Sequence, residues 1–351
     1  MLCWLRPDFQ SRAGYDYSSY SILIPARNEA HNITPLLRSL KKNDLANTEI
    51  IIIDDHSEDD TRGVIIKYEA DFGLNIRYIR LNDDEYGKKQ ALNRGVKEAD
   101  GRVIITMDAD VTVGANWLKT IREAMGESEQ KLLILPVLIE GSGVLGVFQA
   151  LEQRILMFFT HASAKVGRPM LCSGANLVYH KSLFEKLNPY EDNLDIASGD
   201  DMFLLMKAKK LPDVNIETCL NKNAVAHTRA SMTLKSFFYQ RVRWAKKTSV
   251  MDIPESKLLG FIIILFNCLL LITTLSLIKN PVLSYSVTIS WLCKFLFDLL
   301  LLFLVSWKLT VLKSISWFPV VFALYPIYIV FVTIASLVIK PKWKLRKLDN
   351  G

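Results

Sequence analysis

Closely spaced aspartates are the residues of this chain with the clearest capacity for chemistry. Asp108 and Asp110 are one residue apart and follow an apolar run that ends at Met107. In an extended chain, carboxylates with this spacing point to the same side and suit a hard divalent cation shared with a diphosphate. An Asp-x-Asp sequence is also common in surface loops, but its place after a strand-like run favours a functional site. We therefore predict that Asp108 and Asp110 bind Mg²⁺ or Mn²⁺.

The elements that would position these aspartates follow an α/β pattern of apolar runs and helix-like stretches. The expected elements, in chain order, are a strand over 21–25 ended by Pro25, a helix over 34–42, strands over 49–53 and 76–81, a helix over 88–99 and a strand over 103–107. Two strands separated by one helix indicate a parallel βαβ unit. Ligands of such sheets bind at the carboxyl ends of the strands, where Asp54, Asp55 and Asp108 fall.

Two common nucleotide-binding motifs are absent from the sequence. No GxGxxG turn follows the first expected strand, and GxxxxGK[ST] occurs nowhere. Neither a dinucleotide-binding fold nor a P-loop is therefore supported, and a nucleotide would be held in another way.

Several ordered motifs between residues 20 and 250 carry a resemblance to a known family. They are Ser21-Ile-Leu-Ile-Pro-Ala-Arg-Asn-Glu29, Ile53-Asp-Asp-His-Ser57, Gly87-Lys-Lys-Gln-Ala-Leu-Asn-Arg-Gly95, Asp108-Ala-Asp110, Ser173-Gly-Ala-Asn176, Ser198-Gly-Asp-Asp201 and Gln240-Arg-Val-Arg-Trp244. In this order they resemble the inverting glycosyltransferases of family 2, with the last matching QxxRW. The resemblance implies a GT-A nucleotide-diphospho-sugar transferase domain with a mostly parallel sheet, followed by a transmembrane helical region.

The resemblance also implies a role for each matching residue. Asp201 is expected to be the catalytic base, and Asp108 and Asp110 to hold the metal. The expected donor-binding residues are Pro25, Arg27, Glu29, Asp54, Asp55, Lys88, Asp108, Gln240 and Arg243, and the expected acceptor-binding residues are Trp244, Asn176 and Asp200. The sequence departs from the family pattern at Asp200, where Glu is usual, and at His56, where Gly is frequent.

Glycosyl transfer explains why such residues are needed. Negative charge builds on the departing diphosphate, so a divalent cation and fixed cations stabilise the leaving group. A carboxylate on the opposite side of the sugar takes the proton of the attacking hydroxyl, which is the expected role of Asp201. Arg243 is suited to a bidentate contact with the diphosphate, and Trp244 to stacking on the acceptor.

Several of these residues also have an ordinary structural interpretation. Asp200 and Asp201 precede an apolar helical run, and we expect Asp200 to cap that helix while Asp201 reacts. Lys88 opens a helix, so it either reaches a phosphate or lies on a solvated face. Arg241 is expected, with Lys246 and Lys247, to form a basic collar that faces anionic lipid.

Lipid contact is predicted because the apolar residues are concentrated late in the sequence. The chain of 351 residues is 50% hydrophobic and 23% charged, with a net charge of +7. Three segments approach the roughly 20 apolar residues needed to cross a membrane. These candidate spans are 258–278, 282–307 and 314–339, and Lys294 and Asp298 in the middle one lie four residues apart, where they can neutralise each other. Residues 231–249 and 144–160 have the composition of interfacial helices, although a buried core helix also explains the second.

The expected organisation is an N-terminal segment over 1–17, a catalytic domain over 18–250, membrane helices over 251–340 and a basic tail over 341–351. No signal peptide is recognisable in the first 20 residues, so we expect a multi-pass protein of the cell membrane with its catalytic domain in the cytoplasm. Three crossings would leave the basic tail outside, against the usual charge distribution. Either the middle segment does not cross, or the charge rule is broken.

The function expected from the sequence is metal-dependent, inverting transfer of a sugar from a nucleoside diphosphate donor to a lipid or lipid-linked acceptor, with a UDP-sugar as the expected donor. A processive polysaccharide synthase of the cellulose, hyaluronan or chitin type is the main alternative, since such enzymes also carry QxxRW. A catalytically silent scaffold is less consistent with the intact motif residues, and a transporter is less consistent with intramembrane charges, Lys294 and Asp298, that can neutralise each other. The expected partners are the donor, a lipid or glycan acceptor and membrane lipids, and no nucleic acid. The five cysteines are scattered and predict neither a zinc site nor a disulfide framework.

Overall fold

The computed structural model describes residues 19–126, 130–194, 196, 199–278, 282, 284–339, 342–343 and 346–347. The chain divides into two compact units. The first contains residues up to 138 together with 160–229, and the second contains 139–159 together with most residues from 230 onward. Ser198, the segment 1–17 and most of the tail 341–351 lie outside the described residues.

The first unit is built on a seven-stranded sheet with the order β3-β2-β1-β4-β8-β6-β9. The strands are β1 (Tyr20–Ala26), β2 (Thr48–Asp54), β3 (Ile76–Arg80), β4 (Val103–Thr106), β6 (Lys131–Ile134), β8 (Leu177–His180) and β9 (Asn215–Thr218). β1 to β4 are parallel to one another, as are β6 and β9, and only β8 runs antiparallel to its neighbours. This arrangement confirms the predicted α/β class with a mostly parallel sheet. A small second sheet has the order β5-β10-β7, with β5 (Val111–Val113), β7 (Val137–Glu140) and β10 (Ala226–Arg229).

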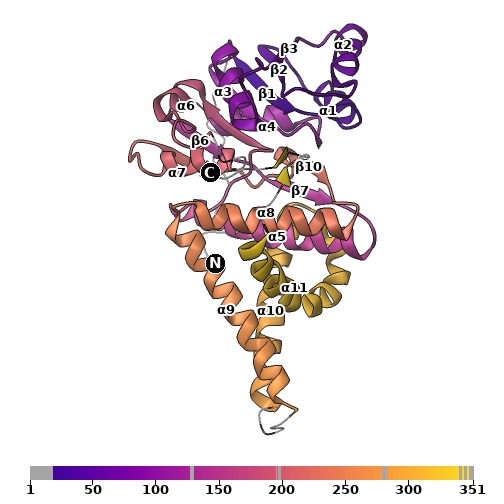
Figure 1. Ribbon diagram of the computed structural model, residues 1–351, viewed down its shortest axis with the longest axis vertical. Helices are drawn as coiled ribbons and strands as arrows, with labels where there is room; N and C mark the ends of the chain where they lie inside the picture. The colour runs from indigo at the N-terminus through magenta and orange to yellow at the C-terminus, as the bar shows by residue number, and fades with distance from the viewer. Residues whose placement is uncertain are drawn as a thin grey trace. The chain divides into compact units, whose positions relative to one another are not determined.

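Helices cover both faces of the large sheet (Figure 1). The helices of the first unit are α1 (Ile33–Leu40), α2 (Thr61–Phe72), α3 (Lys88–Glu98), α4 (Trp117–Met125), α6 (Lys181–Leu187) and α7 (Asp200–Ala208). Side chains alternate along each strand, so Ile22 and Ile50 face a core shared with α1, α2 and α4. On the other face α3 approaches so closely that a Cβ on Gly95 would lie 2.9 Å from Cδ1 of Ile53 and 3.2 Å from Cδ1 of Leu23.

Pro25 does not end the first strand, which continues to Ala26. The carbonyl of Leu23 accepts the N–H of Met107 on the β4 side, and Pro25, two residues later, faces the same side. β1 is paired with β4 only as far as Leu23. The proline ring therefore replaces no N–H that the ladder needs, which is why the strand tolerates it.

The strand order reverses beside β1, because β2 and β3 lie on one side of it and β4 on the other. Ligands of open α/β sheets bind at such a switch point, beyond the carboxyl ends of the strands. Asp54 ends β2, and Asp108 follows two residues after Thr106 ends β4. Leu177 at the start of the antiparallel β8 pairs with Thr106, so the loop that contains Gly174 reaches the same edge.

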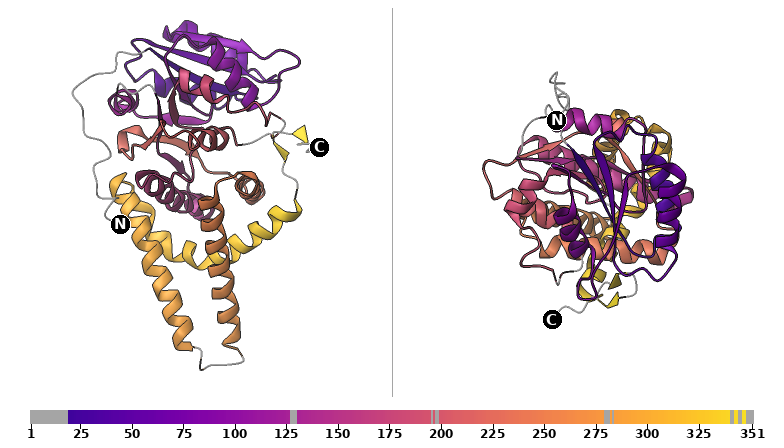
Figure 2. Two further views of the ribbon diagram at one scale, coloured as in Figure 1. Left: turned by 90° about the vertical axis from the view of Figure 1, so that its left-hand side faces the viewer. Right: turned by 90° about the horizontal axis from the view of Figure 1, so that it is seen from above.

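The second unit is helical. Its helices are α5 (Gly143–Lys165, whose residues up to 159 belong to this unit), α8 (Leu234–Val250), α9 (Pro254–Ser276), α10 (Ser284–Lys308) and α11 (Phe318–Val338), with a short 3₁₀ helix, η4 (Leu312–Trp317), before α11. Within the part of the chain that the structure describes, three helical segments are long and apolar enough to cross a membrane: α9, α10 and the segment Leu312–Val338. Figures 1 and 2 show α9 and α10 as a long pair and α11 running transverse to them. Lys294 and Asp298 on α10 form the predicted ion pair.

Candidate active site

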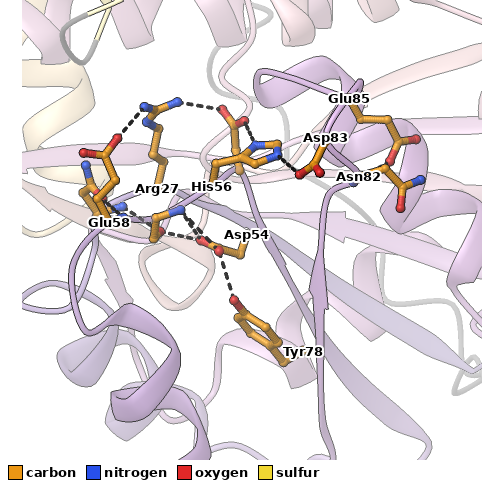
Figure 3. A network of polar contacts seen from close by, with 11 residues as sticks. Arg27, Asp54, His56, Glu58, Tyr78, Asn82, Asp83 and Glu85 are labelled. Atoms are coloured by element: carbon orange, nitrogen blue, oxygen red, sulfur yellow. Dashed lines mark hydrogen bonds and ion pairs between the residues drawn. The ribbon is translucent and has the colours of Figure 1, made fainter.

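Asp54 is held in a buried polar network at the end of β2 (Figure 3). Its carboxylate accepts hydrogen bonds from the backbone N–H of Ser57 at 3.2 Å, from the Ser57 hydroxyl, and from the Tyr78 hydroxyl at 2.9 Å. Burial and the neighbouring Asp54 carboxylate raise the pKa of Tyr78 to about 12. Asp54 thus fixes the turn that follows β2, and Tyr78 stays a hydrogen-bond donor at neutral pH.

Asp55 is also buried and lies beside two basic side chains. One carboxylate oxygen is 3.9 Å from Nη1 of Arg27, and the other is 3.3 Å from Nδ1 of His56. Arg27 also reaches Glu58, at 3.5 Å (Figure 3), and the His56 ring stacks on Tyr86 with centroids 4.6 Å apart. The structure therefore brings together the predicted residues Arg27, Asp54 and Asp55.

The backbone conformation of His56 explains why the resembling family often has glycine at this position. Its φ of 57° lies in the left-handed region, which glycine adopts without steric cost and other residues adopt rarely. The ring stacked on Tyr86 and the contact with Asp55 accompany this conformation. The turn is therefore kept despite the substitution.

Two other predicted donor-binding residues take part in local structure. Pro25 lies within β1, opposite Ile53. The backbone N–H of Glu29 donates to the hydroxyl of Thr61 at 2.9 Å, and its carboxylate accepts from the side-chain amide of Asn32 at 2.8 Å. Glu29 thereby ties the loop after β1 to the start of α1.

Lys88 connects the acidic motifs that are far apart in the sequence. Its ammonium lies 2.8 Å from Oδ1 of Asp108 and 2.9 Å from Oδ2 of Asp200. Burial would lower the pKa of Lys88, but the carboxylates of Asp108 and Asp200 outweigh burial and raise it above the ordinary lysine value. Of the two interpretations left open for Lys88, the solvated face is wrong: its side chain is 20% exposed and sits between two carboxylates.

Asp201 lies next to this cluster at the start of α7. Its Oδ2 accepts a hydrogen bond from the backbone N–H of Gly174 at 3.2 Å, and its Oδ1 accepts one from the backbone N–H of Met202 at 2.7 Å. A Cβ on Gly174 would lie 2.6 Å from Oδ2 of Asp200 and 3.1 Å from Nζ of Lys88, so the loop before β8 closes against the cluster. We define the Lys88 cluster as Lys88, Asp108, Asp200, Asp201 and Gly174.

The prediction that Asp200 caps its helix is wrong. The N-cap residue of α7 is Gly199, with φ of 92°, and no side chain caps the helix. The carboxylate of Asp200 turns instead to Lys88. An ion pair with a buried ammonium is stronger than a cap, which explains the preference.

The predicted metal ligands supply two carboxylates. Asp108 is 41% exposed, and Asp110 is exposed, with one carboxylate oxygen 3.4 Å from the hydroxyl of Thr228. Among the described residues, no group of three or more His, Cys, Asp or Glu side chains is arranged to hold a metal. Two carboxylates with phosphate oxygens completing the shell is a common way to bind Mg²⁺, and the hard oxygen donors of this pair fit that chemistry.

Asn176, predicted to contact the acceptor, is fully buried, and its side chain forms hydrogen bonds with three other segments of the first unit. Its side-chain amide donates to the carbonyls of Pro136 at 2.8 Å and Ala224 at 2.9 Å, and its oxygen accepts from the indole of Trp117 at 3.2 Å. These bonds join the loop before β8 to α4 and to two other loops. Both amide hydrogens and the oxygen are occupied by protein groups.

Gln240, Arg243 and Trp244 lie on α8 in the second unit. The guanidinium of Arg241 lies 4.2 Å from the centroid of the Trp244 ring, so one indole face is covered by protein. The side-chain oxygen of Gln240 accepts from the Arg241 guanidinium and from the hydroxyl of Ser231, at 3.4 Å.

The prediction that Arg241 faces lipid is wrong. It is 3% exposed and bonds Oε2 of Glu152 on α5 at 2.7 Å. The aromatic rings of Phe237 and Trp244 also contact its guanidinium. A buried carboxylate on another helix has thus replaced the lipid phosphate expected as its partner.

Tyr78 and Gly174 are site residues that were not singled out from the sequence. The signal for Tyr78 was its place on β3, in register with Ile52 and two residues before the carboxyl end of β2. The signal for Gly174 is its place in the Ser173-Gly-Ala-Asn176 motif, of which only Asn176 is predicted to contact a ligand.

Part of the chain matches a known protein family. Residues 21–187 match the family described as Glycosyl transferase family 2. The matched range includes Asp54, Lys88, Asp108 and Gly174, and it ends before Asp201. The prediction of a glycosyltransferase is confirmed at the level of this domain.

Two curated relatives match parts of the chain. The poly(ribitol-phosphate) beta-N-acetylglucosaminyltransferase TarS of Staphylococcus aureus is 25% identical over 191 residues, which are 54% of this chain and 32% of that protein. The dolichol-phosphate mannosyltransferase of Mycosarcoma maydis is 38% identical over 100 residues, which are 26% of this chain and 33% of that protein. The chain thus spans about a third of the length of both relatives.

A solved structure matches most of the chain. The mannosyltransferase PcManGT of Pyrobaculum calidifontis, solved with GDP-Man and Mn²⁺, superimposes with a TM-score of 0.57 at 14% identity, covering 95% of this chain and 92% of that one. The likeness shows the fold, which is a GT-A-like α/β domain followed by apolar helices.

Proposed function

We propose that the protein is a membrane-bound, metal-dependent, inverting glycosyltransferase that moves a sugar from a nucleoside diphosphate donor to a lipid or lipid-linked acceptor. The observation that carries the proposal is the Lys88 cluster, in which one ammonium joins Asp108 to Asp200 at the edge of a domain that matches Glycosyl transferase family 2. Asp201, the third carboxylate of this cluster, has both oxygens held by backbone N–H groups.

The donor side is formed by the carboxyl ends of β1, β2 and β4. Arg27 and Asp55 are the base and ribose contacts of a UDP-sugar, while Asp54 and Tyr78 keep their turn in place. Asp108 and Asp110 would hold a Mg²⁺ or Mn²⁺ ion, which would supply positive charge to the leaving diphosphate. Lys88 adds a second positive charge, and the carboxylates around it keep it protonated.

The acceptor side is formed by the start of α7. Asp201 takes the proton of the acceptor hydroxyl while that oxygen attacks the anomeric carbon. The carbon–oxygen bond to the diphosphate breaks on the opposite face of the sugar, so a single displacement inverts the anomeric configuration. The N–H groups that hold both oxygens of Asp201 fix its orientation for this step.

The acceptor is amphiphilic in this proposal, because apolar helices follow the catalytic domain directly. Their composition suits membrane insertion and would bring a lipid-linked hydroxyl to the domain. The name of the relative TarS supports a glycan-phosphate acceptor, and that of the dolichol-phosphate mannosyltransferase supports a lipid-phosphate acceptor.

The test is transfer by the purified full chain in lipid nanodiscs, with UDP- and GDP-sugars screened against extracted lipid acceptors. Asp201→Asn should lower the transfer rate by about 10²–10⁴-fold, the usual contribution of a general base. Donor affinity, measured by calorimetry with UDP or GDP, should change by less than about threefold. Asp213→Asn is the matched control, because Asp213 is half exposed and pairs only with Lys186 among the described contacts.

A normal rate for Asp201→Asn would remove Asp201 from the mechanism. Product length separates the two functional hypotheses. A single added sugar supports the proposal, and a ladder of lengths supports a processive polysaccharide synthase.

A further inference from the structure

The segment Leu312–Val338 is as apolar as a membrane-spanning helix, with a mean hydropathy of 2.3 over its best window. By length and composition alone it would be a third crossing. Its contacts within the second unit describe a different position, and they bear on the side of the membrane that the C-terminus occupies.

The helices α9 and α10 form a hairpin whose two outer ends, the start of α9 and the end of α10, both lie next to α5 and α8. α9 begins four residues after α8 ends. At the other end of the pair, the buried guanidinium of Arg154 on α5 donates to the Ser306 hydroxyl at 3.4 Å, to the Val311 carbonyl at 2.9 Å and to the Ser314 hydroxyl at 2.8 Å. α5 is itself fastened to α8, since Arg241 bonds Glu152 and the Ser231 N–H donates to Gln149. The start of α9 and the end of α10 therefore lie in the layer formed by α5 and α8.

α11 contacts the layer formed by α5 and α8 along most of its length. Its first residue, Phe318, belongs to an apolar cluster with Val147 and Leu151 of α5. Phe331, about 20 Å further along the helix, packs on Phe238 of α8 with ring centroids 5.1 Å apart. A crossing helix would have carried Phe331 through most of the hydrocarbon core by this point. Figure 2 shows the same course, with α11 transverse to the α9–α10 pair.

A polar contact fastens the middle of α11 to the layer. The Tyr328 hydroxyl donates to Oε1 of Glu152 at 2.6 Å, the carboxylate whose other oxygen bonds Arg241. The Tyr328 ring packs on Phe148 at 4.9 Å and on Phe237 at 5.5 Å. Because an ionised carboxylate and guanidinium are expensive at the centre of a bilayer, this point of α11 belongs near its surface.

Six of the large apolar side chains exposed on α11 form one stripe, in which successive members are three or four residues apart. They are Val320 (43% exposed), Leu324 (46%), Ile327 (62%), Phe331 (61%), Ile334 (58%) and Val338 (79%), while Leu337 (83%) lies to one side of the stripe. On the opposite side Val321, Phe322 and Val332 are buried against protein. A helix with one apolar stripe along its length is suited to lie in the plane of a membrane, with the stripe on the hydrocarbon.

We propose that the chain crosses the membrane twice, through α9 and α10, and that α11 lies within one leaflet without crossing. Its exposed stripe contacts acyl chains, while its other side packs on α8 and α9 and on the apolar cluster shared with α5 and α10. The C-terminal tail then lies on the same side as α5, which is continuous with the catalytic unit. The basic residues of that tail, Lys340, Lys342, Lys344, Arg346 and Lys347, thereby remain on the catalytic side with anionic lipid headgroups. Three crossings would place the basic tail on the side opposite the catalytic domain. This conflict disappears if the third segment, rather than the middle one, does not cross.

Reporter insertions test the number of crossings. A reporter of membrane sidedness is attached before Met1, inserted between Ile278 and Ser284, or attached after Gly351 in the full chain. The two terminal reporters should give the same side and the inserted reporter the opposite one. Terminal reporters on opposite sides would mean that α11 crosses and would overturn the proposal.

A depth measurement tests the position of α11 directly. Single cysteines are introduced at Val320, Ile327 and Ile334 in a chain whose native cysteines are replaced by serine, labelled with a fluorophore and quenched by lipids that carry a quencher at known depths. An in-plane helix should give three similar depths. The control positions on α9 are Leu258, Phe266 and Leu275, which should give a shallow, deep and shallow profile. The same profile on α11 would refute the in-plane position, whatever the effect of the substitutions on activity.

Discussion

Replacing Lys88 with methionine tests the proposed organisation of the active site most directly. Methionine keeps an unbranched side chain of similar length but removes the ammonium between Asp108 and Asp200. The two carboxylates, both within 2.9 Å of that ammonium, then face each other without it. Lys97→Met is the matched control, because Lys97 is exposed on the last turn of the same helix.

The loss in free energy of unfolding expected for Lys88→Met follows from how exposed each of its two ion pairs is. The Asp200 side chain is 12% exposed, so its charge-assisted hydrogen bond should contribute about 1.5–3 kcal/mol. The Asp108 side chain is 41% exposed, and solvent screening reduces its pair to about 0–1 kcal/mol. The nearest oxygens of the two carboxylates are at most about 6 Å apart, so their repulsion is at least about 3 kcal/mol at an effective dielectric constant of 20, before solvent around the exposed Asp108 screens it. Because these contributions overlap, we expect Lys88→Met to lower the free energy of unfolding by about 2–4 kcal/mol.

The metal response distinguishes an active-site role from a purely structural one. Lys88 occupies one oxygen of Asp108, so without the ammonium the free protein should bind Mn²⁺ more tightly, by about tenfold for each 1.4 kcal/mol of relieved repulsion. Added Mn²⁺ should restore part of the lost stability, whereas the transfer rate should stay low because the cation facing the diphosphate is missing. Calorimetric titration with Mn²⁺, thermal unfolding with and without the metal, and transfer rates measure the three effects.

The pH dependence gives an independent check with a definite sign. The pKa of Lys88 is raised, so its stabilising contribution is complete below the ordinary lysine pKa and is lost only as pH rises through the higher folded value. The stability difference between the wild type and Lys88→Met should therefore be constant from pH 6 to 9. Stability equal to that of Lys97→Met, or unchanged Mn²⁺ affinity, would contradict the charge-cluster interpretation.

Three further substitutions probe the other parts of the site. Asp110→Ala should raise the Mn²⁺ concentration needed for half-maximal transfer by about tenfold or more, and a metal titration of the transfer rate that matched the wild type would remove Asp110 from the metal site. Gly174→Ala should cost about 1–3 kcal/mol in thermal unfolding and lower the transfer rate, because its Cβ would lie 2.6 Å from Oδ2 of Asp200; unaltered rate and stability would mean that the loop moves freely. Tyr78→Phe should cost about 1 kcal/mol for the lost bond to Asp54. Since the pKa of Tyr78 is raised to about 12, its stabilising contribution is complete below about pH 10 and lost as pH rises through 12, so unfolding measured across pH 8–12 should show the difference from Tyr78→Phe shrinking only in that window.

The strands and helices around the site could be predicted because local periodicity determines them. Apolar runs ended by aspartates gave β2 and β4, and the parallel βαβ pattern then placed Asp54 and Asp108 at one edge. The partner of Asp200 could not be predicted in this way. A cap and an ion pair are equally compatible with an aspartate before a helix, and the choice depends on Lys88, which is distant in the sequence and brought close by the fold.

The helices after the catalytic domain show a similar limit. Arg241 has the spacing of a basic collar, and nothing adjacent in the sequence reveals Glu152 as its buried partner. Length and hydropathy likewise identify Leu312–Val338 as membrane-compatible without giving its orientation. Orientation depends on tertiary contacts such as the bond from Tyr328 to Glu152.

The electrostatics of the Lys88 cluster support the proposed metal dependence. Around one ammonium stand three carboxylates, those of Asp108, Asp200 and Asp201, so the formal charge of the cluster is negative. A diphosphate is also negative and would be repelled from such a site if it arrived alone. A divalent cation held by Asp108 and Asp110 would offset that repulsion, and Lys88 could then also stabilise the leaving group. The carboxylates of Asp200 and Asp201 can then serve the acceptor, because the positive charge that attracts the donor is supplied on the other side of the cluster.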